Sequence, residues 1–530
     1  MQRRSYDIAP VQPDLLADLP ARIHMIPEEG AKAGRSRPAF TDERGAVWSY
    51  DRLIDTIEQV SHELAAVGVR SGDRVLIACE NSIAAIVLMY AVSRLDAWSV
   101  MVNARQSQRE LELIASDCRP RVTLYTHVVS ADADAHACRQ GAHVQRFSGI
   151  GDVKMTSPDE QVQPEDVYAD PARQVAVLIY TTGTTGKPKG VMLSHRNLTF
   201  VAARGKRTRT LLADDVGLCL MPISHSYGLV TMQGLLFAGG HLRIVPRFSL
   251  PTTIEAIRGG ELTLFIAVPA LLARLVAHVD QAGIVMTPNR LRYAYTGTAP
   301  LDLSLRRDVE RVLGVVLQNG YGLTETSPTI SRSNYCKGSD EINIGPPIPG
   351  VEVRIVDQNG DAVPDDVPGE LHVRGPNVML GYYRQPELTR AIIDADGFLN
   401  TGDIVSRTSR GELVIQGRSK ELIIRSGFNV YPGEVEAVLN AHHAVLASAV
   451  VGRAVEGDEE IVAFVEVAPE RAVDVDDLFA LADTQLARYK KPQHIVVLPS
   501  LPMAPNGKVL KSELKKYAES LGRDDGKRRP

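Results

Sequence analysis

The segment Tyr180-Thr-Thr-Gly-Thr-Thr-Gly-Lys-Pro-Lys-Gly190 continues an apolar run that begins at Val175. Its glycines let the backbone approach a polyphosphate, its threonine hydroxyls add hydrogen-bond donors, and its lysines supply positive charge. We therefore predict a phosphate-binding loop that follows a buried strand. The candidate phosphate-binding residues are Thr181, Thr182, Gly183, Thr184, Thr185, Gly186, Lys187 and Lys189.

The spacing within this segment differs from that of the common nucleotide-binding loop, GxxxxGK(S/T). Only two residues separate Gly183 from Gly186, and Pro188 follows Lys187. The segment is therefore not a Walker-type NTPase loop. A flexible surface turn is the alternative, but ordinary turns seldom combine glycines, threonines and lysines in this density.

Upstream of the loop, the sequence predicts alternating helices and strands. Apolar residues recur at steps of four and three in a predicted helix that Gly68 ends, and a short apolar strand follows at residues 74–79. Asn81 and Ser82 then predict the start of a second apolar helix that reaches Arg94. Such alternation is typical of a parallel sheet. The first helical face consists of Leu53, Ile57, Val60, Leu64 and Val67.

Downstream of the loop, the sequence pattern changes twice. Apolar runs at 262–268 and 292–295 still resemble α/β units, but from about Gly345 short alternating strands lie between Gly, Pro and Asp residues. Beyond Gly417, helices and strands mix again. We expect an α/β fold with a large N-terminal domain of stacked α/β subdomains and a small, mobile α+β C-terminal domain. The predicted boundaries are 1–418, with a β-rich subdomain at about 345–417, and 419–530.

The composition is that of a globular protein. The chain has 530 residues, of which 44% are hydrophobic, and 59 Lys and Arg against 64 Asp and Glu give a formal net charge of −5. A chain of this size buries most of its surface, which excludes a lone binding peptide or a disordered scaffold. The charge is spread along the sequence, with no basic block before the terminal GKRRP, so we expect no nucleic-acid partner.

Cysteine usage and the apolar runs indicate the compartment. Five cysteines are scattered without CxxC spacing, which favours reduced cytosolic thiols over a disulfide framework or a zinc site. The N-terminal residues have no apolar core after their arginines, so we expect no cleaved signal peptide. The most apolar run, at 83–92, is about half of the ~20 residues that a membrane-spanning helix needs. We expect a soluble, cytoplasmic protein without a transmembrane segment.

The phosphate loop closely resembles the signature of the adenylate-forming superfamily, which includes acyl- and aryl-CoA synthetases, peptide-synthetase adenylation domains and luciferases. Further motifs of this superfamily follow in the same order, so the resemblance covers nearly the whole chain. The run at 381–386 and the motif that begins at Gly427 look most like those of fatty-acyl-CoA ligases. The motifs are Tyr321-Gly-Leu-Thr-Glu-Thr326, Thr401-Gly-Asp403, Gly417-Arg-Ser-Lys-Glu421, Gly427-Phe-Asn-Val-Tyr-Pro432 and Pro505-Asn-Gly-Lys508.

The resemblance implies a site for ATP and Mg²⁺. Glu325 and Thr181 would be the protein ligands of the magnesium ion, a sparse shell that suits an ion which keeps several waters. Glu325 could instead be an exposed charge or a helix cap. Tyr321 would flank the adenine, and Thr324 would contact the α-phosphate. The other residues at the nucleotide and acyl turns would be Gly297, Thr298, Ala299 and Gly322, and Thr298 stands where many members carry alanine.

The resemblance also assigns roles to residues near the C-terminus. Asp403 would accept hydrogen bonds from the ribose hydroxyls, and Arg418 would hold ribose or phosphate. Lys508 would bridge the substrate carboxylate and the α-phosphate, whereas Gly427 would border the channel for the thiol of coenzyme A. Because both cannot occupy the site at once, the C-terminal domain would turn about Lys420 between the two half-reactions.

His225 corresponds to a family histidine at the acyl pocket, although a histidine after a strand can also cap or pack. The other histidines show no HExxH or Cys/His metal spacing, and no GxSxG elbow supports a serine hydrolase. Lys508, Glu325 and His225 are therefore the candidate catalytic residues.

These residues predict an ATP-dependent acyl-CoA synthetase, which activates a monocarboxylic acid as acyl-AMP, transfers it to coenzyme A and releases AMP and pyrophosphate. Retention of Thr181, Glu325, Asp403, Arg418 and Lys508 argues against a catalytically silent interaction protein. No segment resembles a carrier domain, which favours free coenzyme A as the acceptor. The alternative acceptor is the phosphopantetheine of a separate carrier protein.

The predicted acyl pocket is apolar or small. Its four segments, at 225–230, 296–299, 319–322 and 345–347, contain no Arg or Lys. A second carboxylate would lose its water there without gaining a partner, which is strongly unfavourable. We therefore expect a medium- or long-chain fatty acid, with an aromatic acid as the alternative.

Overall fold

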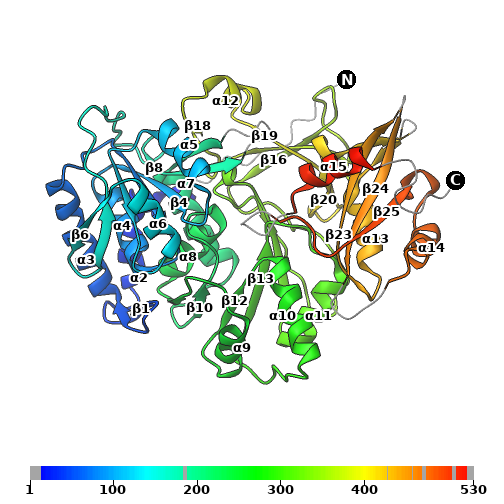
Figure 1. Cartoon of the computed structure of the whole chain (residues 1–530), viewed down its shortest axis with the longest axis horizontal. Coiled ribbons are helices and arrows are strands. Elements are labelled where there is room, and N and C mark those ends of the chain that lie inside the picture. The colour runs from blue at the N-terminus through cyan, green and yellow to red at the C-terminus, as the bar shows by residue number, and fades with distance from the viewer. Residues whose placement is uncertain are drawn as a thin grey trace.

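An eight-stranded mixed sheet forms the centre of the N-terminal part in the computed structural model, which describes residues 14–182, 188–425, 428–455, 458–467, 473–503 and 509–521 (Figure 1). The four strands in its middle are parallel, and the strands at both edges are antiparallel to their neighbours. In spatial order the strands are β18 (Gly381–Tyr382), β9 (Pro188–Ser194), β8 (Val175–Thr182), β4 (Trp98–Asn103), β3 (Arg74–Cys79), β5 (Val122–Tyr125), β7 (Gly151–Met155) and β6 (His143–Phe147).

Helices cover both faces of this sheet, because alternate residues of its central strand belong to two different cores. Val75 and Ile77 pack with α3 (Tyr50–Ala66) and α4 (Ile83–Arg94). Leu76 and Ala78 pack on the opposite side with α5 (Gln108–Cys118) and α6 (Ala131–Arg139). The predicted helical face lies on α3, and the predicted strand at 74–79 is β3. Ser49 and Ser82 cap α3 and α4 with their side chains, as helix starts of this type require.

Two further four-stranded sheets complete the α/β part. The first has the order β10 (Val216–Cys219), β11 (His241–Ile244), β1 (Pro38–Thr41) and β2 (Val47–Ser49). The second has the order β12 (Leu264–Ile266), β13 (Tyr293–Gly297), β14 (Leu317–Tyr321) and β15 (Ser331–Arg332). The strand expected at 262–268 is shorter than predicted, because Pro269 starts the next helix.

The helices around these sheets differ in how deeply they are buried. Between the first small sheet and its neighbours lies α8 (Ser226–Ala238), which packs against α7 (His195–Thr208), β10 and β11 and is buried on nearly all sides. Such a helix gives a rigid support for residues at its N-terminus. The other helices of this region are α9 (Leu250–Arg258), α10 (Pro269–Gln281) and α11 (Leu303–Leu313), which lie at the lower end of the view in Figure 1.

The β-rich part follows as an antiparallel sheet of four strands. Its spatial order is β16 (Glu352–Val356), β17 (Gly369–Arg374), β19 (Leu399–Arg407) and β20 (Leu413–Arg418). In β17 buried and half-buried residues alternate, as expected for a sheet with one face on a core. The change of sequence pattern expected near Gly345 therefore corresponds to a change from mixed parallel and antiparallel sheets to a fully antiparallel sheet.

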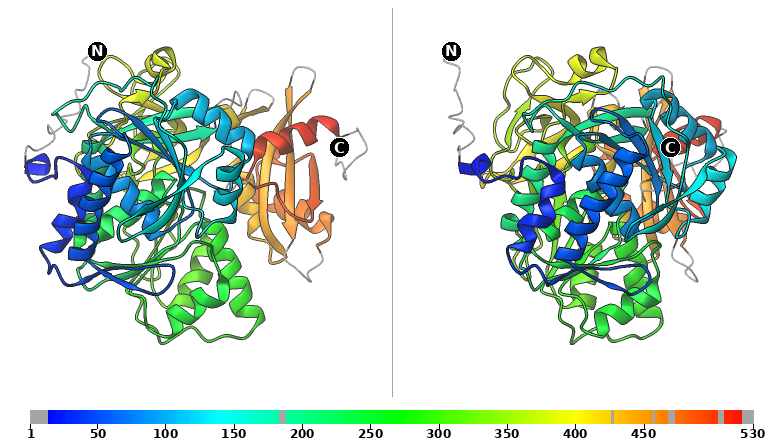
Figure 2. Two further views of the ribbon diagram at one scale, coloured as in Figure 1. Left: turned by 60° about the vertical axis from the view of Figure 1, so that its left-hand side comes forward. Right: turned by 90° about the vertical axis from the view of Figure 1, so that its left-hand side faces the viewer.

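The last elements gather on one side of the molecule, in orange to red in Figure 1 and in the left view of Figure 2. They form a two-stranded and a three-stranded sheet with three helices. Their bounds are β21 (Ile423–Arg425), β22 (Phe428–Val430), α13 (Pro432–Asn440), β23 (Val445–Val455), β24 (Asp458–Val467), α14 (Val475–Gln485), β25 (His494–Leu498) and α15 (Lys511–Ser520).

The remaining short elements connect these units. They are α1 (Asp14–Ala17), η1 (Ile23–Met25), α2 (Ile26–Ala31), η2 (Thr324–Thr326), α12 (Pro386–Ile392), η3 (Ser419–Glu421) and η4 (Arg488–Lys490). Within the described ranges, no helix combines the length and the apolar character needed to cross a bilayer.

Candidate active site

Three of the predicted nucleotide-binding residues meet where β14, β19 and β20 come together. The Tyr321 hydroxyl donates a hydrogen bond to Oδ2 of Asp403, and Nε of Arg418 lies 3.0 Å from Oδ1 of the same carboxylate. Arg418 stands directly opposite Asp403 in the ladder of β19 and β20. Asp403 is buried, whereas half of the Arg418 side chain is exposed. The fold therefore fixes the Asp403 carboxylate and leaves a guanidinium at the surface beside it.

The Tyr321 hydroxyl remains a neutral donor. Burial, with the Asp403 carboxylate as the second cause, raises the pKa of Tyr321 well above its usual value. A phenol that keeps its proton can hold the carboxylate acceptor in one orientation.

Glu325 lies on the short helix η2, which packs against β9 beside the predicted phosphate loop. Its Oε1 accepts a hydrogen bond of 2.8 Å from the hydroxyl of Tyr382, and Nζ of Lys189 lies 5.2 Å from the centre of the Tyr382 ring. Thr181 pairs with Lys189 in the ladder of β8 and β9. The structure thus brings Thr181, Lys189 and Glu325 into one neighbourhood through Tyr382.

Tyr382 was not among the predicted site residues. The run at 381–386 contains it, but that run pointed only to a class of ligases. Burial is the main cause, and the Glu325 carboxylate the second, of a raised Tyr382 pKa, so this hydroxyl also stays protonated. The sequence around Tyr382 does not indicate its hydrogen-bond partner, because Glu325 lies 57 residues away along the chain.

Thr324 and His225 meet at the N-terminus of α8. Oγ1 of Thr324 and Oγ of Ser226 share a hydrogen bond of 3.2 Å. His225 caps α8, because its Nδ1 accepts a hydrogen bond of 3.3 Å from the backbone N–H of Tyr227. The capping role considered as the alternative for His225 is therefore present, and it orients the ring at the entrance to the helix.

The predicted nucleotide turns lie at the ends of β13 and β14, where Gly297 pairs with Gly320. A Cβ added to Gly322 would lie 1.3 Å from the backbone oxygen of Pro328, so this position accepts no side chain. Thr298 has φ of 75°, in the left-handed region that disfavours a β-branched residue. Such strain persists only where the surrounding structure enforces it, and it often accompanies a functional turn. Ala299 follows Thr298 in this turn and is half-buried.

An aromatic cluster borders these turns. The rings of Tyr227, Tyr293 and Tyr295 are stacked, with centroids 6.4 Å apart for Tyr227 and Tyr295 and 6.1 Å apart for Tyr293 and Tyr295. The guanidinium of Arg209, which follows α7, lies 4.5 Å from the centre of the Tyr295 ring. Arg209 lies outside the four segments assigned to the acyl pocket, yet the fold brings its charge beside Tyr295. The absence of Arg and Lys from the four segments therefore does not exclude a cation close to them in space.

Lys420 lies between two sets of contacts at the start of the C-terminal elements. On its N-terminal side, the Ser419 hydroxyl donates to Glu370 of β17. On its C-terminal side, Nζ of Lys511 lies 3.0 Å from Glu421 and 2.8 Å from Glu436 of α13. The side chain of Lys420 is exposed.

Several predicted site residues lie outside the described residues. Of the loop, Thr182 pairs with Pro188 through the strand ladder. The residues that the structure does not describe are Gly183, Thr184, Thr185, Gly186, Lys187, Gly427 and Lys508.

The donor set near Glu325 suits a hard cation. Among the described residues, no group of three or more His, Cys, Asp or Glu side chains could hold a metal ion. Mg²⁺ is commonly held by one or two protein oxygens together with waters and substrate phosphates, and the carboxylate of Glu325 with the hydroxyl of Thr181 supplies that chemistry.

The family assignment follows from matches to both parts of the chain. Residues 27–383 match the family model described as AMP-binding enzyme, and residues 434–508 match the AMP-binding enzyme C-terminal domain. The chain belongs to the AMP-binding enzyme family. The predicted superfamily is thereby confirmed.

Named relatives of this AMP-binding enzyme are CoA ligases. It is 31% identical to 4-coumarate–CoA ligase 5 of Oryza sativa subsp. japonica, over 91% of this chain and 92% of the relative. It is 30% identical to a long-chain-fatty-acid–CoA ligase of Yersinia pestis, over 98% of this chain and 97% of the relative. Among solved structures, ATP-bound MatB from Rhodopseudomonas palustris aligns with a TM-score of 0.81 at 29% identity, over 94% of this chain and 99% of that one.

These similarities confirm the predicted fold class, with a large α/β N-terminal part and a small C-terminal part. They also confirm that this AMP-binding enzyme is an ATP-dependent, AMP-forming acid–thiol ligase.

Proposed function

We propose that the enzyme converts a carboxylic acid to its acyl-AMP and transfers the acyl group to the thiol of coenzyme A. A carboxylate is a poor electrophile, so one of its oxygens must become part of a leaving group. Attack of that oxygen on the α-phosphate of ATP releases pyrophosphate, and attack of the thiol on the acyl carbon then releases AMP. The observation that carries this proposal is the meeting of Tyr321, Asp403 and Arg418 at one point of the fold.

The proposed nucleotide site extends from Asp403 to the phosphate loop. Asp403, held by Tyr321 and Arg418, accepts hydrogen bonds from the ribose hydroxyls, because an ionised carboxylate is a strong hydrogen-bond acceptor. Thr324 contacts the α-phosphate at the start of α8. The loop residues and Lys189 neutralise the other phosphates. A magnesium ion held by Glu325 and Thr181 would stabilise negative charge as pyrophosphate leaves.

Two groups act at different times in this proposal. Lys508 bridges the attacking carboxylate and the α-phosphate, where a cation offsets charge that develops in the transition state. Gly427 borders the path of the coenzyme A thiol, and a turn about Lys420 exchanges the two. Coenzyme A is the proposed acceptor.

The aromatic cluster bears on which acid is used. Stacked tyrosine rings form a flat apolar wall that suits an aromatic ring as well as an alkyl chain. The sequence favoured a medium- or long-chain fatty acid because no cation was expected at the pocket. With Arg209 beside Tyr295, we instead favour a compact acid, aromatic or carrying a polar far end, over a long alkyl chain.

A test of the proposed function measures pyrophosphate release and product mass. The full-length protein is supplied with ATP, Mg²⁺ and single acids from a panel of fatty and aromatic acids, with and without coenzyme A. We expect pyrophosphate release with at least one acid, and a thioester of the expected mass only when coenzyme A is present. Acyl-AMP that accumulates beside coenzyme A without any thioester would overturn the proposed acceptor.

A further inference from the structure

Arg209 is a deeply buried cation without a carboxylate partner in the part of the chain that the structure describes. It is 5% exposed, and the groups that act on its charge are the hydroxyls of Tyr295, Tyr293 and Tyr227. Burial raises the pKa of Tyr227 and of Tyr293, so both of these phenols stay neutral at physiological pH. The guanidinium charge is therefore stabilised by aromatic rings and dipoles, and not by an anion.

Three other buried arginines have a carboxylate partner, whereas Arg204, which is 4% exposed, has none within 4.0 Å among the described residues and donates a hydrogen bond to a backbone oxygen. Arg74, Arg121 and Arg306 are at most 3% exposed, and each has a carboxylate oxygen within 4.0 Å. Pairing of this kind offsets the large cost of removing a charge from water. Because Arg209 lacks such a partner, its position is costly unless an anion from outside the chain occupies the site.

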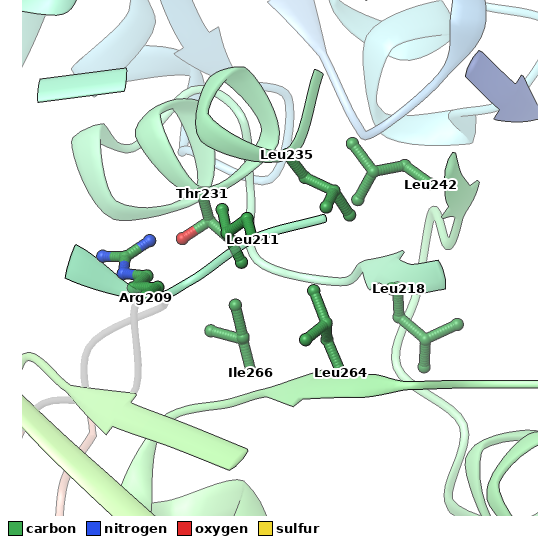
Figure 3. A pocket seen from close by; sticks show the side chains of 9 residues that line it. Arg209, Leu211, Leu218, Thr231, Leu235, Leu242, Leu264 and Ile266 are labelled. Atoms are coloured by element: carbon green, nitrogen blue, oxygen red, sulfur yellow. The ribbon is translucent and has the colours of Figure 1, made fainter. Parts of the chain in front are cut away.

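Two hydroxyl groups beside Arg209 also lack partners among the described residues. The Tyr227 hydroxyl and Oγ1 of Thr231 are buried and make no hydrogen bond. Tyr227 and Thr231 are four residues apart on α8, so they lie on the same face of that helix. Figure 3 shows the Thr231 oxygen directed toward the Arg209 guanidinium, and both side chains line one cavity.

The site lies next to the turns at which the acid is activated. The ring of Tyr227 would be 3.8 Å from a Cβ on Gly297, and the hydroxyl of Tyr295 approaches Gly320 so closely that a Cβ there would clash. Gly297 and Gly320 are paired residues of the nucleotide turns. Arg209, 4.5 Å from the centre of the Tyr295 ring, is thus separated from these turns by a single side chain, a distance that a compact acid can span.

Beyond Arg209 there is little room for an alkyl chain. The cavity that Arg209 and Thr231 share continues between Leu218, Leu235 and Leu264, and its volume is about 10 Å³. That volume accommodates about one water molecule. One oxygen of a carboxylate can take the place of that water beside Arg209 and Thr231, whereas a long apolar tail would have to displace the side chains that line the cavity.

Resting on the proposed function, we propose that Arg209, Tyr227 and Thr231 recognise a second carboxylate at the end of the acid opposite to the one that is activated. The guanidinium supplies the charge and two parallel N–H donors, and the two hydroxyls supply further donors. The substrate class is therefore a compact dicarboxylic acid, in which one carboxylate becomes the acyl-AMP and the other remains ionised against Arg209.

The experiment compares matched acids that differ only at the far end. Adipate is compared with hexanoate, and 4-carboxyphenylacetate with 4-methylphenylacetate, by kcat/KM for pyrophosphate release in the full-length protein. We expect the dicarboxylate of at least one pair to exceed its methyl-ended counterpart by at least ~10²-fold, because a site built for a polar group rejects the analogue that lacks it. A wild-type preference for both methyl-ended acids would overturn the inference and leave the proposed function intact. If none of the tested acids supported pyrophosphate release, the proposed function itself would be overturned.

Variants then test whether Arg209 causes the preference. Arg209→Met should remove or reverse it, and Arg209→Lys should keep part of it, while the KM for ATP stays unchanged in both. Thr231→Val, which keeps the side-chain shape, should weaken the preference several-fold. Stabilisation by the dicarboxylate, read as a rise in unfolding temperature, should be present in the wild type and absent in Arg209→Met. An unchanged preference in Arg209→Met or in Thr231→Val would contradict the assigned contacts. If Arg209→Met does not fold, Thr231→Val and the wild-type temperature shift decide the outcome.

Discussion

Glu325 and Tyr382 form a unit in which a neutral phenol holds a carboxylate beside the phosphate loop. The hydrogen bond between them fixes one oxygen of Glu325 and leaves the other available to a cation. A glutamine at this position would keep the size and the hydrogen bond, because an amide oxygen also accepts from a hydroxyl. It would lose the negative charge, so this substitution separates the proposed metal role of Glu325 from its structural role.

We therefore predict that Glu325→Gln folds normally and loses at least ~10²-fold in adenylation rate, because charge that develops on the phosphates is no longer offset. Pyrophosphate release at varied Mg²⁺ concentration measures this, and the KM for Mg²⁺ should rise. Tyr382→Phe is the matched control and should cost less, since it removes only the orienting hydrogen bond. Wild-type pyrophosphate release by Glu325→Gln would rule out the metal role.

Single residues also show how far the sequence could predict this site. Tyr321, Asp403, Glu325 and Thr324 were identified through motifs, and the structure places Tyr321 at the end of β14, Thr324 and Glu325 on η2, and Asp403 within β19. Arg209 could not be identified in this way, because it lies in a run of arginines and threonines that reads as a solvated helix end. Its burial arises from the packing of α8 and β13, which are distant in sequence.

At the scale of single elements, η1 carries a titratable group into the core. The ring of His24 lies against α4, with Nδ1 3.1 Å from the Ser93 hydroxyl. Burial, and then the charge of Arg94, lowers the pKa of His24 to about 4. The unfolded chain would bind a proton near the ordinary value of 6.5, so the folded state is the poorer base.

We predict that the free energy of unfolding decreases as the pH falls from about 6.5 toward about 4. In that window His24 binds a proton in the unfolded state but stays unprotonated in the folded state. Between pH 7 and pH 5 the loss from this residue alone is about 2 kcal/mol. Denaturant unfolding of the wild type and of His24→Asn at both pH values measures it, and the variant should show the smaller pH dependence. Equal pH dependence in the two proteins would contradict the assignment.

The short element η3 connects the β-rich sheet to the C-terminal elements. Ser419 is held by Glu370 of the β-rich sheet, whereas Glu421 is held by Lys511 of α15. Lys420 is the residue between these two attachments. A rotation of the C-terminal elements would therefore change the backbone dihedral angles mainly at Lys420, as at a hinge.

We predict that Lys420→Pro, which fixes φ, retains acyl-AMP formation within ~3-fold and reduces thioester formation by at least ~10-fold. Single-turnover measurements of each half-reaction check this. Lys420→Ala is the matched control, because it removes the same charge without restricting the backbone, and it should retain both half-reactions. Loss of acyl-AMP formation in Lys420→Pro with the fold intact would contradict a hinge role.

Element boundaries followed from the sequence where local signals decide them. Ser82 caps the second helix at the predicted start, and the strand at β3 has the expected bounds. The first helix was predicted from its periodicity, and the structure shows that Ser49 caps it. The pairing of β1 with β11 could not be predicted, because Phe40 and Leu242 are neighbours only through contacts that join distant segments. Local patterns thus specify the elements, and non-local packing specifies their order in the sheets.

At the scale of the whole molecule, we propose that the two half-reactions use different residues of the C-terminal part. Lys508 is proposed for the first and the Gly427 loop for the second. We predict that Lys508→Ala loses at least ~10²-fold in acyl-AMP formation, because a cation at the α-phosphate is removed, yet retains thioester formation from preformed acyl-AMP. Lys515→Ala, which removes an exposed lysine of α15, is the matched control and should change neither rate. Equal damage to both half-reactions in Lys508→Ala would argue against two working conformations.

The phosphate loop joins two antiparallel neighbours of one sheet, since β8 and β9 pair up to Thr182 and Pro188. In a strand-to-helix loop, the positive end of a helix macrodipole attracts the phosphates. After β8 the next helix, α7, begins only at His195, after all of β9, so no helix N-terminus directly follows the predicted loop. If this loop binds a triphosphate, the attraction would come from lysine side chains such as that of Lys189 and from a divalent ion that arrives with the nucleotide. The affinity for ATP should consequently depend on the divalent-ion concentration, and it should fall steeply as the ionic strength rises.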